Sequence, residues 1–414
     1  MNIVVSRKSI VGYDNNYDKF YVRKNSSLFF GVSFAVFLVV MILRTSFFSH
    51  MFGLDREIVY KLLMLGCICM LMLKEYIVEK HYFVLVIQLC VIMALVLLVK
   101  KVDSFTAATS LFFLYSCRNE DFEYIAKIAL AVTTVLLGLV IVSSLIGIIP
   151  NYEFDLDTER PRYFLGFGYA LFAPAYLFNV VALVFYLKKD KVNMIIILME
   201  FLACYYIYKK TDSRLSFGFT ILLILASLAV KIPFRKFKKH IRYIYNPFKA
   251  LVTMGITLTF VICAFVSIAI TVKYDSSNEL HAKINSIFAQ RLYFGQKSYQ
   301  EYGIKPFGQR INWIGNGLDS EGNPEEGDYL YVDNLYLQFL QRFGYVVFCI
   351  IMLLLSYSMY RMVKEKAWIM IIIMILIAGH AMLDDLVLHL WYNTFWLALI
   401  PYFVHDSIKI KKKQ

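Results

Sequence analysis

The feature that most limits the possible folds of this sequence is a succession of apolar blocks, many of them close to 20 residues long. A helix of about 20 apolar residues is long enough to cross the hydrocarbon core of a bilayer. Hydrophobic residues make up 59% of the 414 residues and charged residues 18%, which is little charge for the surface of a soluble protein. The blocks lack the alternation typical of membrane strands. The sequence therefore predicts an all-α, polytopic membrane protein.

The apolar blocks predict about 12 transmembrane helices. Two of them, 58–73 and 104–117, are short, and either is a candidate for a re-entrant segment instead. The predicted spans are 28–48, 58–73, 82–99, 104–117, 124–149, 163–187, 192–208, 214–230, 250–272, 334–360, 368–384 and 389–406.

Positive charge is concentrated in the segments that the predicted topology places on one side of the membrane. Residues 231–249 hold seven Lys or Arg and the tail "KIKKKQ" holds four, whereas the much longer segment 273–332 holds only six. Cytoplasmic loops carry such an excess, so both termini are predicted to be cytoplasmic. The net charge of +13 then indicates topology and contact with anionic lipids rather than binding of nucleic acid.

The chain divides into one membrane domain and its flanking segments. Residues 1–27 are predicted to be a cytoplasmic N-terminal segment, too long and polar for the head of a cleavable signal sequence. The transmembrane domain spans 28–407, and 408–414 is a basic cytoplasmic tail. Within the domain, 273–332 is predicted to be a long extracytoplasmic loop. Loops of this length are usually functional or disordered, and its aromatic content, with an amphipathic helix over 279–302, favours a folded loop.

Charged residues at the predicted outer face are the candidates for chemistry, because charge at membrane depth is expensive. Arg214 opens a helix after "KKTDS" and is either a snorkelling side chain, a partner of Asp212, or a fixed cation for an anionic group. Asp333 and Asn334 stand where the buried helix "LYLQFL" begins. Asp333 is an acceptable helix cap, and that role alone explains an Asp at this position.

Further candidates lie in the loop and before an earlier span. Arg291 lies in the amphipathic helix, with Tyr293 beside it as a candidate for binding substrate. Arg310 follows the turn "KPFG", and Arg162 precedes "YFLGF", where glycines allow close backbone approach. Snorkelling, or ordinary surface charge, is the alternative for each arginine.

Two acid–histidine pairs carry a weaker signal. His380 and Asp384 are four residues apart, as are Asp385 and His389, so either pair can form on a helix. Structural pairing is the simpler interpretation; a metal site or proton relay needs further ligands, which the spacing does not supply. The seven cysteines lie in apolar segments without disulfide or metal-ligand spacing. The sequence has no phosphate-binding loop, no dinucleotide-binding turn and no Gly-x-Ser-x-Gly motif.

Arginines at an outer membrane face suit one substrate class well. A lipid-linked sugar diphosphate presents two anionic phosphates there, and guanidinium groups bind phosphate through paired hydrogen bonds. When the bond between sugar and diphosphate breaks, fixed cations stabilise the charge that develops on the leaving group. A carboxylate can accept the proton of the attacking hydroxyl. Arginines can do this electrostatic work without a metal, so no cofactor is predicted.

The pattern resembles the superfamily of O-antigen ligases and Wzy-type polysaccharide polymerases. Members have roughly a dozen spans and a long outer loop, followed by a His-Asn pair, nine residues and a glycine. Here Asp333-Asn334 is followed by nine residues and Gly344. Asp333 replaces the histidine of the family, so a base at this position would be a carboxylate.

The family's arginines also have counterparts in this chain. In the family, one arginine opens the span that precedes a basic inner loop, and Arg214 matches it. A second arginine lies in the outer loop and is followed by a Pro-hydrophobic-Gly turn; Arg291 with "KPFG" matches it. The Arg-x-x-x-Gly-Phe stretch matches Arg162, but the His-Pro-Asn that follows it in the family is absent. The likeness covers about residues 157–350.

The resemblance implies a GT-C-like membrane glycosyltransferase of the bacterial plasma membrane. Its expected reaction is metal-independent, inverting polymerisation of undecaprenyl-diphosphate-linked repeat units into capsular polysaccharide, exopolysaccharide or O-antigen. Arg214, Arg291 and Asp333 are the expected catalytic residues, with Arg162, Arg310, Asn334 and Tyr293 binding substrate. The expected partners are the lipid-linked donor and acceptor, membrane lipids, a flippase and a chain-length regulator. A ligase acting on another acceptor and a lipid-linked oligosaccharide flippase are the alternatives.

Overall fold

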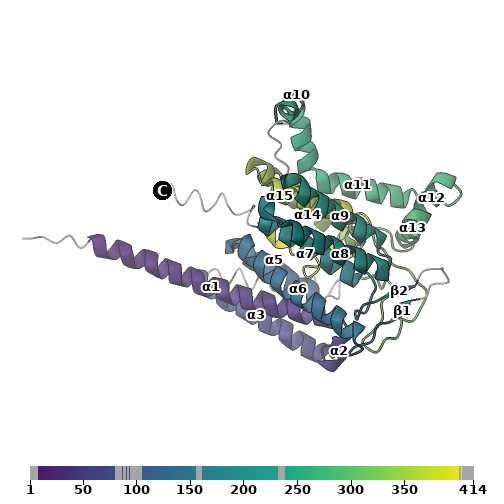
Figure 1. Ribbon diagram of the computed structural model, residues 1–414, viewed down its shortest axis with the longest axis horizontal. Coiled ribbons are helices and arrows are strands. Elements are labelled where there is room, and N and C mark those ends of the chain that lie inside the picture. The colour runs from purple at the N-terminus through teal and green to yellow at the C-terminus, as the bar shows by residue number, and fades with distance from the viewer. Residues whose placement is uncertain are drawn as a thin grey trace, which may run out of the picture.

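The computed structural model describes residues 8–79, 105–154, 161–231 and 238–400, with the single positions 86, 90, 93 and 402. These residues are mostly helical (Figure 1). The α-helices are α1 (Lys8–Arg44), α2 (Phe48–Met51), α3 (Glu57–Glu79), α5 (Phe105–Ser116), α6 (Phe122–Leu145), α7 (Phe172–Lys188), α8 (Met194–Thr211), α9 (Arg214–Lys231), α10 (Lys238–Thr257), α11 (Thr259–Val272), α12 (Glu279–Ile287), α13 (Arg291–Tyr302), α14 (Leu335–Lys364) and α15 (Trp368–His380). Short 3₁₀ turns cover Cys117–Asn119, Lys189–Lys191 and Leu386–Leu388, and an antiparallel pair of strands, β1 (Glu153–Phe154) and β2 (Arg162–Tyr163), completes the set.

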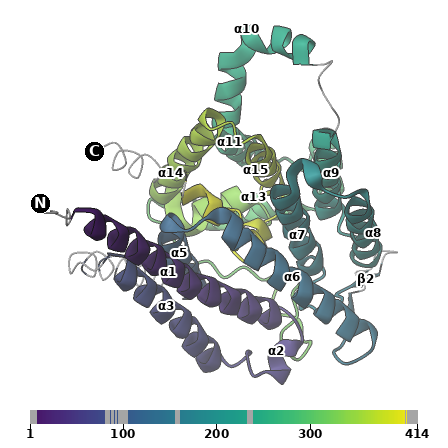
Figure 2. The same ribbon diagram turned by 60° about the vertical axis from the view of Figure 1, so that its left-hand side comes forward.

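The helices form one bundle around an apolar core. Helix α1 packs against α3 and α6, and α7 packs between α6 and α9 (Figure 2). On the other side α11 packs against α13, α14 and α15, and α15 also contacts α9. Helix α7 lies at the centre and buries most of its residues, including Tyr176 and Asn179. The buried amide of Asn179 is satisfied by Thr394, to which its Nδ2 donates at 3.1 Å.

Five of these helices are long and apolar enough to cross a membrane, or six if one bent pair counts as a span. They are Ser26–Arg44, Phe122–Leu145, Phe172–Lys191, Arg214–Lys231 and Leu335–Lys364, with the pair Phe248–Thr257 and Thr259–Val272 as the sixth. Several apolar helices are therefore compatible with a multi-pass membrane protein, whereas the predicted number of 12 spans is not confirmed.

The difference from 12 has several physical sources. The predicted span 104–117 is the 12-residue α5, and 368–384 is the 13-residue α15, both shorter than a bilayer crossing requires. The predicted span 250–272 is bent by 66° between α10 and α11. The C-terminal block 389–406 begins with turns rather than helix.

Some predicted segments lie wholly or largely outside the described residues. These are the first seven residues, the basic stretch 232–237, the tail 408–414 and most of the predicted span 82–99. Residues 8–27, expected as a polar N-terminal segment, belong to the start of α1, which continues without interruption into the first span.

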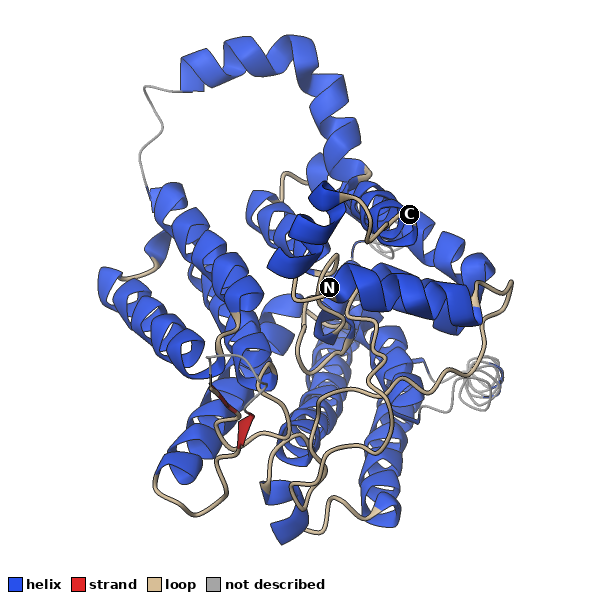
Figure 3. Ribbon diagram, turned by 90° about the vertical axis from the view of Figure 1, so that its right-hand side faces the viewer, coloured by secondary structure: helices blue, strands red, loops and turns tan. Residues whose placement is uncertain are grey.

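Many of the chain connections gather at one end of the bundle (Figure 3). We call this the loop end and define it by Thr45, Gly168, Arg291, Asp333 and Ala381, which lie at or near the ends of helices. The Gly168 amide donates to the Thr45 carbonyl at 2.9 Å, and the Leu335 amide donates to the Ala381 carbonyl at 3.1 Å. The ends of α1 and α15 and the starts of α7 and α14 therefore meet there.

A second group of buried charges lies toward the opposite end. Lys74 is fully buried between Glu75, at 3.1 Å, and Glu120, at 3.2 Å, and Arg118 pairs with Glu75 at 2.5 Å. Lys74 lies 14 residues along α3 from Tyr60, whose ring contacts Arg44 near the loop end. At 1.5 Å per residue this is about 21 Å. The two cations and two carboxylates compensate one another, as buried charges require.

The long loop 273–332 is folded, but its helical part differs from the prediction. The expected helix over 279–302 is two helices, α12 and α13, separated by a turn in which Ala289 and Gln290 have positive φ angles of 51° and 64°. A second, smaller core joins the loop to α14; it is built by Ile311, Trp313, Leu330 and Val332 of the loop and Leu337 of α14. The indole of Trp313 donates to the Ser298 hydroxyl on α13 at 3.0 Å, so the loop is fixed to its own helix.

A break in α14 holds the loop against the bundle. Gly344 has φ 86° and ψ 163°, a conformation open essentially only to glycine. The amides of Tyr345 and Val346 donate to the carbonyls of Lys305 and Pro306, at 3.3 and 3.1 Å. A Cβ added at Gly344 would lie 2.3 Å from the Pro306 oxygen. The nine residues before Gly344 thus form a separate helical segment, and the turn at 305–308 fills the break.

We expect Gly344→Ala to lower the free energy of unfolding by about 1–3 kcal/mol through backbone strain alone, with the clash against Pro306 adding to this loss. The matched control is Gly218→Ala in α9, where an added Cβ meets nothing within 4 Å and alanine favours the helix. Thermal unfolding of the purified variants measures both effects. Equal unfolding midpoints for the two variants would contradict the role assigned to the break.

Candidate functional site

Arg291 is placed by the turn that separates α12 from α13. Asn285 is 2% exposed. Its side-chain oxygen Oδ1 accepts hydrogen bonds from the backbone amides of Leu292 and Tyr293, at 3.1 and 3.2 Å, and so caps the start of α13. Its Nδ2 donates to the Tyr274 hydroxyl at 3.2 Å. This local network, together with the left-handed turn before it, fixes the first residue of α13, which is Arg291.

Asp333 faces Arg291 across the loop end. The Arg291 Nε atom lies 3.5 Å from the Asp333 Oδ2 atom, and both side chains are largely buried, at 15% and 11% exposure. A second guanidinium nitrogen of Arg291 donates to the Leu383 carbonyl. The structure therefore brings together two residues that are 42 positions apart in the chain and that the sequence analysis named separately.

The structure also separates the two roles considered for Asp333. Asn334, not Asp333, is the N-cap of α14, because its Oδ1 accepts from the Tyr336 and Leu337 amides at 3.1 and 3.3 Å. Asn334 is further held by Thr271, whose hydroxyl accepts from its Nδ2 at 3.3 Å. The carboxylate of Asp333 is thereby left for Arg291. Asn334, predicted to bind substrate, has a structural contact for each of its polar atoms.

Two further carboxylates, which the sequence analysis treated as structural pairs, join this group. Asp385 is 3% exposed and accepts from the Tyr331 hydroxyl at 2.6 Å and from Gln338 Nε2 at 2.9 Å. Asp384, 2% exposed, lies 3.4 Å from His380 Nε2. The predicted pair of Asp385 with His389 does not form, since His389 instead stacks on Trp391 with ring centroids 4.4 Å apart.

Burial and mutual repulsion act on these carboxylates in different ways. Burial, reinforced by the negative charges of Asp333 and Asp384, raises the pKa of Asp385 to about 7. Burial also raises the pKa of Asp333 above its ordinary value, although Arg291 opposes this shift. For Asp384 burial is outweighed by His380 and Arg291, and its pKa is lowered. The group therefore contains two carboxylates with a raised pKa, Asp333 and Asp385, and one with a lowered pKa, Asp384.

The remaining predicted site residues lie around this group rather than within it. Arg214 is the first residue of α9, as predicted, but its side chain is 55% exposed and lies 3.4 Å from Asp212. Arg162 is half-buried in β2 and its charge acts on Tyr329, which also feels Asp333. Arg310 and Tyr293 are exposed.

Arg214 and Arg291 lie at the same end of the bundle, although no hydrogen bond or ion pair joins them in the described parts of the chain. Phe219 of α9 stacks on His380 of α15 with ring centroids 4.9 Å apart. Arg214 is five residues nearer the loop end on α9, and Arg291 contacts Leu383 just beyond α15. The two arginines therefore lie at the same end of the bundle and do not contact each other in the described residues.

No family model, no curated protein and no solved structure matches this chain. Within residues 8–79, 105–154, 161–231 and 238–400, no three His, Cys, Asp or Glu side chains are grouped so as to hold a metal ion.

We expect Asn285→Ala to destabilise the protein more than Asn278→Ala. Both residues cap a loop helix, but Asn278 is exposed at the start of α12, whereas Asn285 is buried and also donates to Tyr274 and Gln290. Loss of an N-cap costs about 0.5–2 kcal/mol, and the buried partners left unsatisfied add to this. Thermal unfolding of both variants checks the order. An equal or smaller loss for Asn285→Ala would refute it.

A second prediction concerns pH. The folded-state pKa of Asp385 is about 7 against an ordinary value of 3.8, so the folded protein binds this proton more tightly than the unfolded chain. The resulting stability is fully present below the ordinary pKa and is lost as pH rises through about 7.

The unfolding temperature of the unmodified protein should therefore fall between about pH 5 and about pH 8 more steeply than that of Asp385→Asn, which keeps an acceptor oxygen but does not titrate. Asp328→Asn, at an exposed position of the loop, is the matched control and should keep the steep slope. Identical slopes for all three proteins would contradict the pKa of Asp385.

Proposed function

We propose that this chain is a membrane glycosyltransferase that polymerises lipid-linked oligosaccharide repeat units. The observation that carries the proposal is the contact of Arg291 with Asp333, at 3.5 Å, in a largely buried position where the folded loop meets the start of α14. A guanidinium and a carboxylate are the two groups that glycosyl transfer from a diphosphate requires, one for the leaving group and one for the attacking hydroxyl.

In the proposed reaction the hydroxyl of one repeat unit attacks the anomeric carbon of the growing chain. Asp333 accepts the hydroxyl proton while the bond between the anomeric carbon and the diphosphate oxygen breaks, with inversion at the carbon. Arg291 stabilises the negative charge that develops on the departing diphosphate. Before substrate arrives, Arg291 also favours the ionised form of Asp333, although burial raises its pKa.

Arg214 has a different place in this mechanism. Its guanidinium is exposed at the start of α9 and has only Asp212 as its ion-pair partner in the described part of the chain. An exposed arginine at the same end as Arg291 is suited to binding the distal phosphate or guiding the donor to the site. Arg162 and Arg310 are auxiliary, since neither belongs to the buried group.

A flippase for the lipid-linked unit is the second candidate, and two observations favour it. Broken helices are typical of transporters, and here α10 and α11 meet at 66° while α14 breaks at Gly344. A buried carboxyl with a pKa of about 7, as in Asp385, suits a proton-coupled cycle. A ligase that transfers finished glycan shares the donor chemistry of the polymerase, and nothing in the geometry favours it over polymerisation.

The deciding experiment is mass analysis of glycans formed by the purified protein from its own lipid-linked repeat unit in detergent. Polymer formed there, where no second compartment exists, supports the transferase and rules out a flippase as the sole activity. Unchanged repeat units in detergent, together with movement of the same lipid across a vesicle membrane, would replace the proposal with the flippase. In a deletion strain, accumulated single repeats indicate a polymerase and accumulated long lipid-linked chains indicate a ligase.

Arg291→Ala should lower the rate of polymerisation by about 10²–10³-fold, the usual cost of losing one donor to a developing anion. Arg291→Lys should recover only part of the rate, because lysine lacks the planar fork. Asp333→Asn should cost about 10²–10⁴-fold if the carboxylate is the general base. Lys297→Ala is the matched control, since Lys297 is an exposed cation on the same helix. Normal chain length with Arg291→Ala would overturn the assignment.

A further inference from the structure

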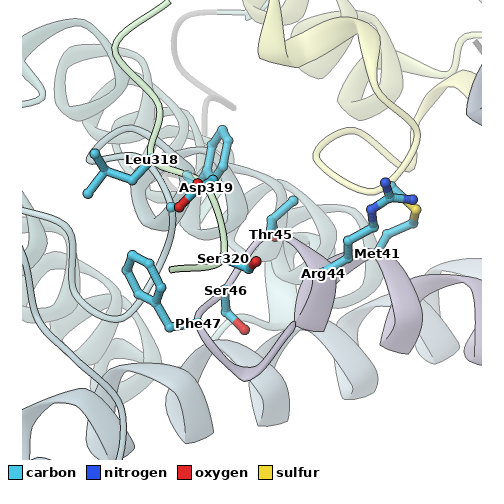
Figure 4. A pocket seen from close by; sticks show the side chains of 10 residues that line it. Met41, Arg44, Thr45, Ser46, Phe47, Leu318, Asp319 and Ser320 are labelled. Carbon is cyan, nitrogen blue, oxygen red and sulfur yellow. The ribbon is translucent and has the colours of Figure 1, made fainter. Parts of the chain in front are cut away.

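A partly open cavity of about 200 Å³ lies at the loop end, away from the Arg291 group. None of the residues predicted to be catalytic or to bind substrate lines it. Its walls are the last turn of α1 with residues 45–47, Gly168 and Phe172 from the start of α7, and loop residues 318–320. Figure 4 shows Thr45, Ser46 and Ser320 between Arg44 on one side and Phe47 on the other.

The walls of the cavity are fixed by backbone hydrogen bonds between segments that are distant in the chain. The Phe47 amide donates to the Gly166 carbonyl at 3.0 Å, and the Leu318 amide donates to the Gly168 carbonyl at 2.7 Å. Gly168 permits this approach, because an added Cβ there would lie 3.0 Å from the Leu318 oxygen. The cavity is therefore formed before any ligand binds, which limits the conformational entropy lost on binding.

Two polar groups in the cavity have capacity for a ligand. The Arg44 guanidinium lies over the Tyr60 ring, 3.8 Å from its centroid, and forms no ion pair in the described ranges; Glu57 feels its charge but pairs with Lys61 at 2.6 Å. The Ser320 hydroxyl has no hydrogen-bond partner among the described residues.

The other polar side chains of the cavity are already committed to the protein. The Thr45 hydroxyl donates to the Ile42 carbonyl at 2.9 Å, and the Ser46 hydroxyl donates to the Leu43 carbonyl at 2.8 Å. Asp319 accepts from the amide of Asn323 at 2.8 Å and so closes its own loop. An arginine held on an aromatic ring, without a carboxylate partner among the described residues, is therefore the group that defines the preferred ligand.

We propose that this cavity is a subsite for one sugar ring of the glycan, in which Arg44 holds the carboxylate of an acidic sugar. Its volume of about 200 Å³ is below the roughly 300–1,000 Å³ of pockets for drug-sized ligands, which favours one ring over a longer segment of glycan. Phe47 and Phe172 supply aromatic surface for the C–H face of the ring, and a few polar groups fix the orientation, as in ligand pockets generally. The role of such a subsite in synthesis rests on the proposed glycosyl transfer, whereas the binding itself does not.

The position of the cavity relative to Arg291 and Asp333 suits this role. Phe172 contacts Tyr169 edge to face, with ring centroids 5.5 Å apart. The Tyr169 phenol in turn feels the charges of Asp333 and Arg291, and burial together with Asp333 raises its pKa. Phe172 and Tyr169 therefore extend from the cavity toward the charged group. A glycan with one ring in the cavity can present a neighbouring residue to the charged group.

The test is binding of two probes, methyl β-D-glucuronide and methyl β-D-glucoside, to the full chain in phospholipid nanodiscs free of sugar detergent. Saturation-transfer NMR is expected to detect both sugars, with the glucuronide bound about tenfold more tightly because of its charge-assisted contact with Arg44. Arg44→Gln should bring the glucuronide to the affinity of the glucoside. Ser320→Trp, which fills the cavity, should abolish binding of both.

Glu326→Gln, at an exposed position of the same loop, is the control and should change neither affinity. Thermal unfolding shows whether each variant is folded; if Ser320→Trp is not, Phe172→Ala takes its place and should weaken both sugars. The inference is overturned if neither sugar binds, if the cavity variants leave binding unchanged, or if the two sugars bind equally and Arg44→Gln has no effect.

The two proposals fail separately. Polymerisation without sugar binding in this cavity would reject the subsite alone, and sugar binding that Ser320→Trp abolishes, in a protein that forms no polymer, would reject the polymerase alone.

Discussion

The contact between Arg291 and Asp333 is the interaction on which the loop end depends. Three carboxylates, those of Asp333, Asp384 and Asp385, are buried there, and Arg291 is the guanidinium that contacts this group directly. Carboxylates buried without compensation would protonate or open the structure to water. Arg291 reaches both Asp333 and the Leu383 carbonyl, so one side chain connects the loop, the start of α14 and the segment after α15.

The position of Arg291 depends in turn on how the loop is joined to the bundle. A small core around Trp313 joins the loop to α14, and the turn of the loop at 305–308 fills the break in α14 at Gly344. In a helix that crosses a membrane, broken backbone is tolerated where protein satisfies the freed groups, and here the carbonyls of Lys305 and Pro306 do so. The break therefore costs few hydrogen bonds and gives the loop a fixed register against α14.

How much of this arrangement the sequence reveals depends on whether the signal is local. Arg214 opens a helix and Asp333 precedes one, as expected from their neighbours, and the nine-residue spacing to Gly344 marks a real break. The contact of Arg291 with Asp333 could not be predicted without the tertiary structure. The two residues are 42 positions apart, and no local pattern in the sequence sets the distance between them. Asp385 was missed for the same reason: its partners Tyr331 and Gln338 lie near 333 in the chain, not near 385. An acidic pair inside an apolar block, "LDDLV", was the available signal.

The number of spans was the least predictable feature, for a physical reason. Hydropathy measures composition along the chain, whereas a span also needs a helix long enough to reach across the bilayer. The block 250–272 has the composition of a span but bends by 66°. The block 368–384 ends as helix at His380, and Asp384 and Asp385, which follow it, are buried at the loop end. The last residues of that apolar block therefore belong to the candidate site and not to a helix.

The two proposed sites divide the loop end by chemistry. Around Arg291, three carboxylates face one guanidinium, and this arrangement favours proton transfer. An anionic ligand would have to displace Asp333 from Arg291 or share Arg291 with it. Around Arg44, a cation without an ion-pair partner in the described chain meets aromatic surface, so an acidic sugar is favoured and proton transfer is not. Phe172 and Tyr169 extend from the cavity toward the charged group. The proposed polymerase would have to hold a chain in register while only one bond reacts, and a fixed subsite on the Tyr169 side of the candidate site would meet that requirement.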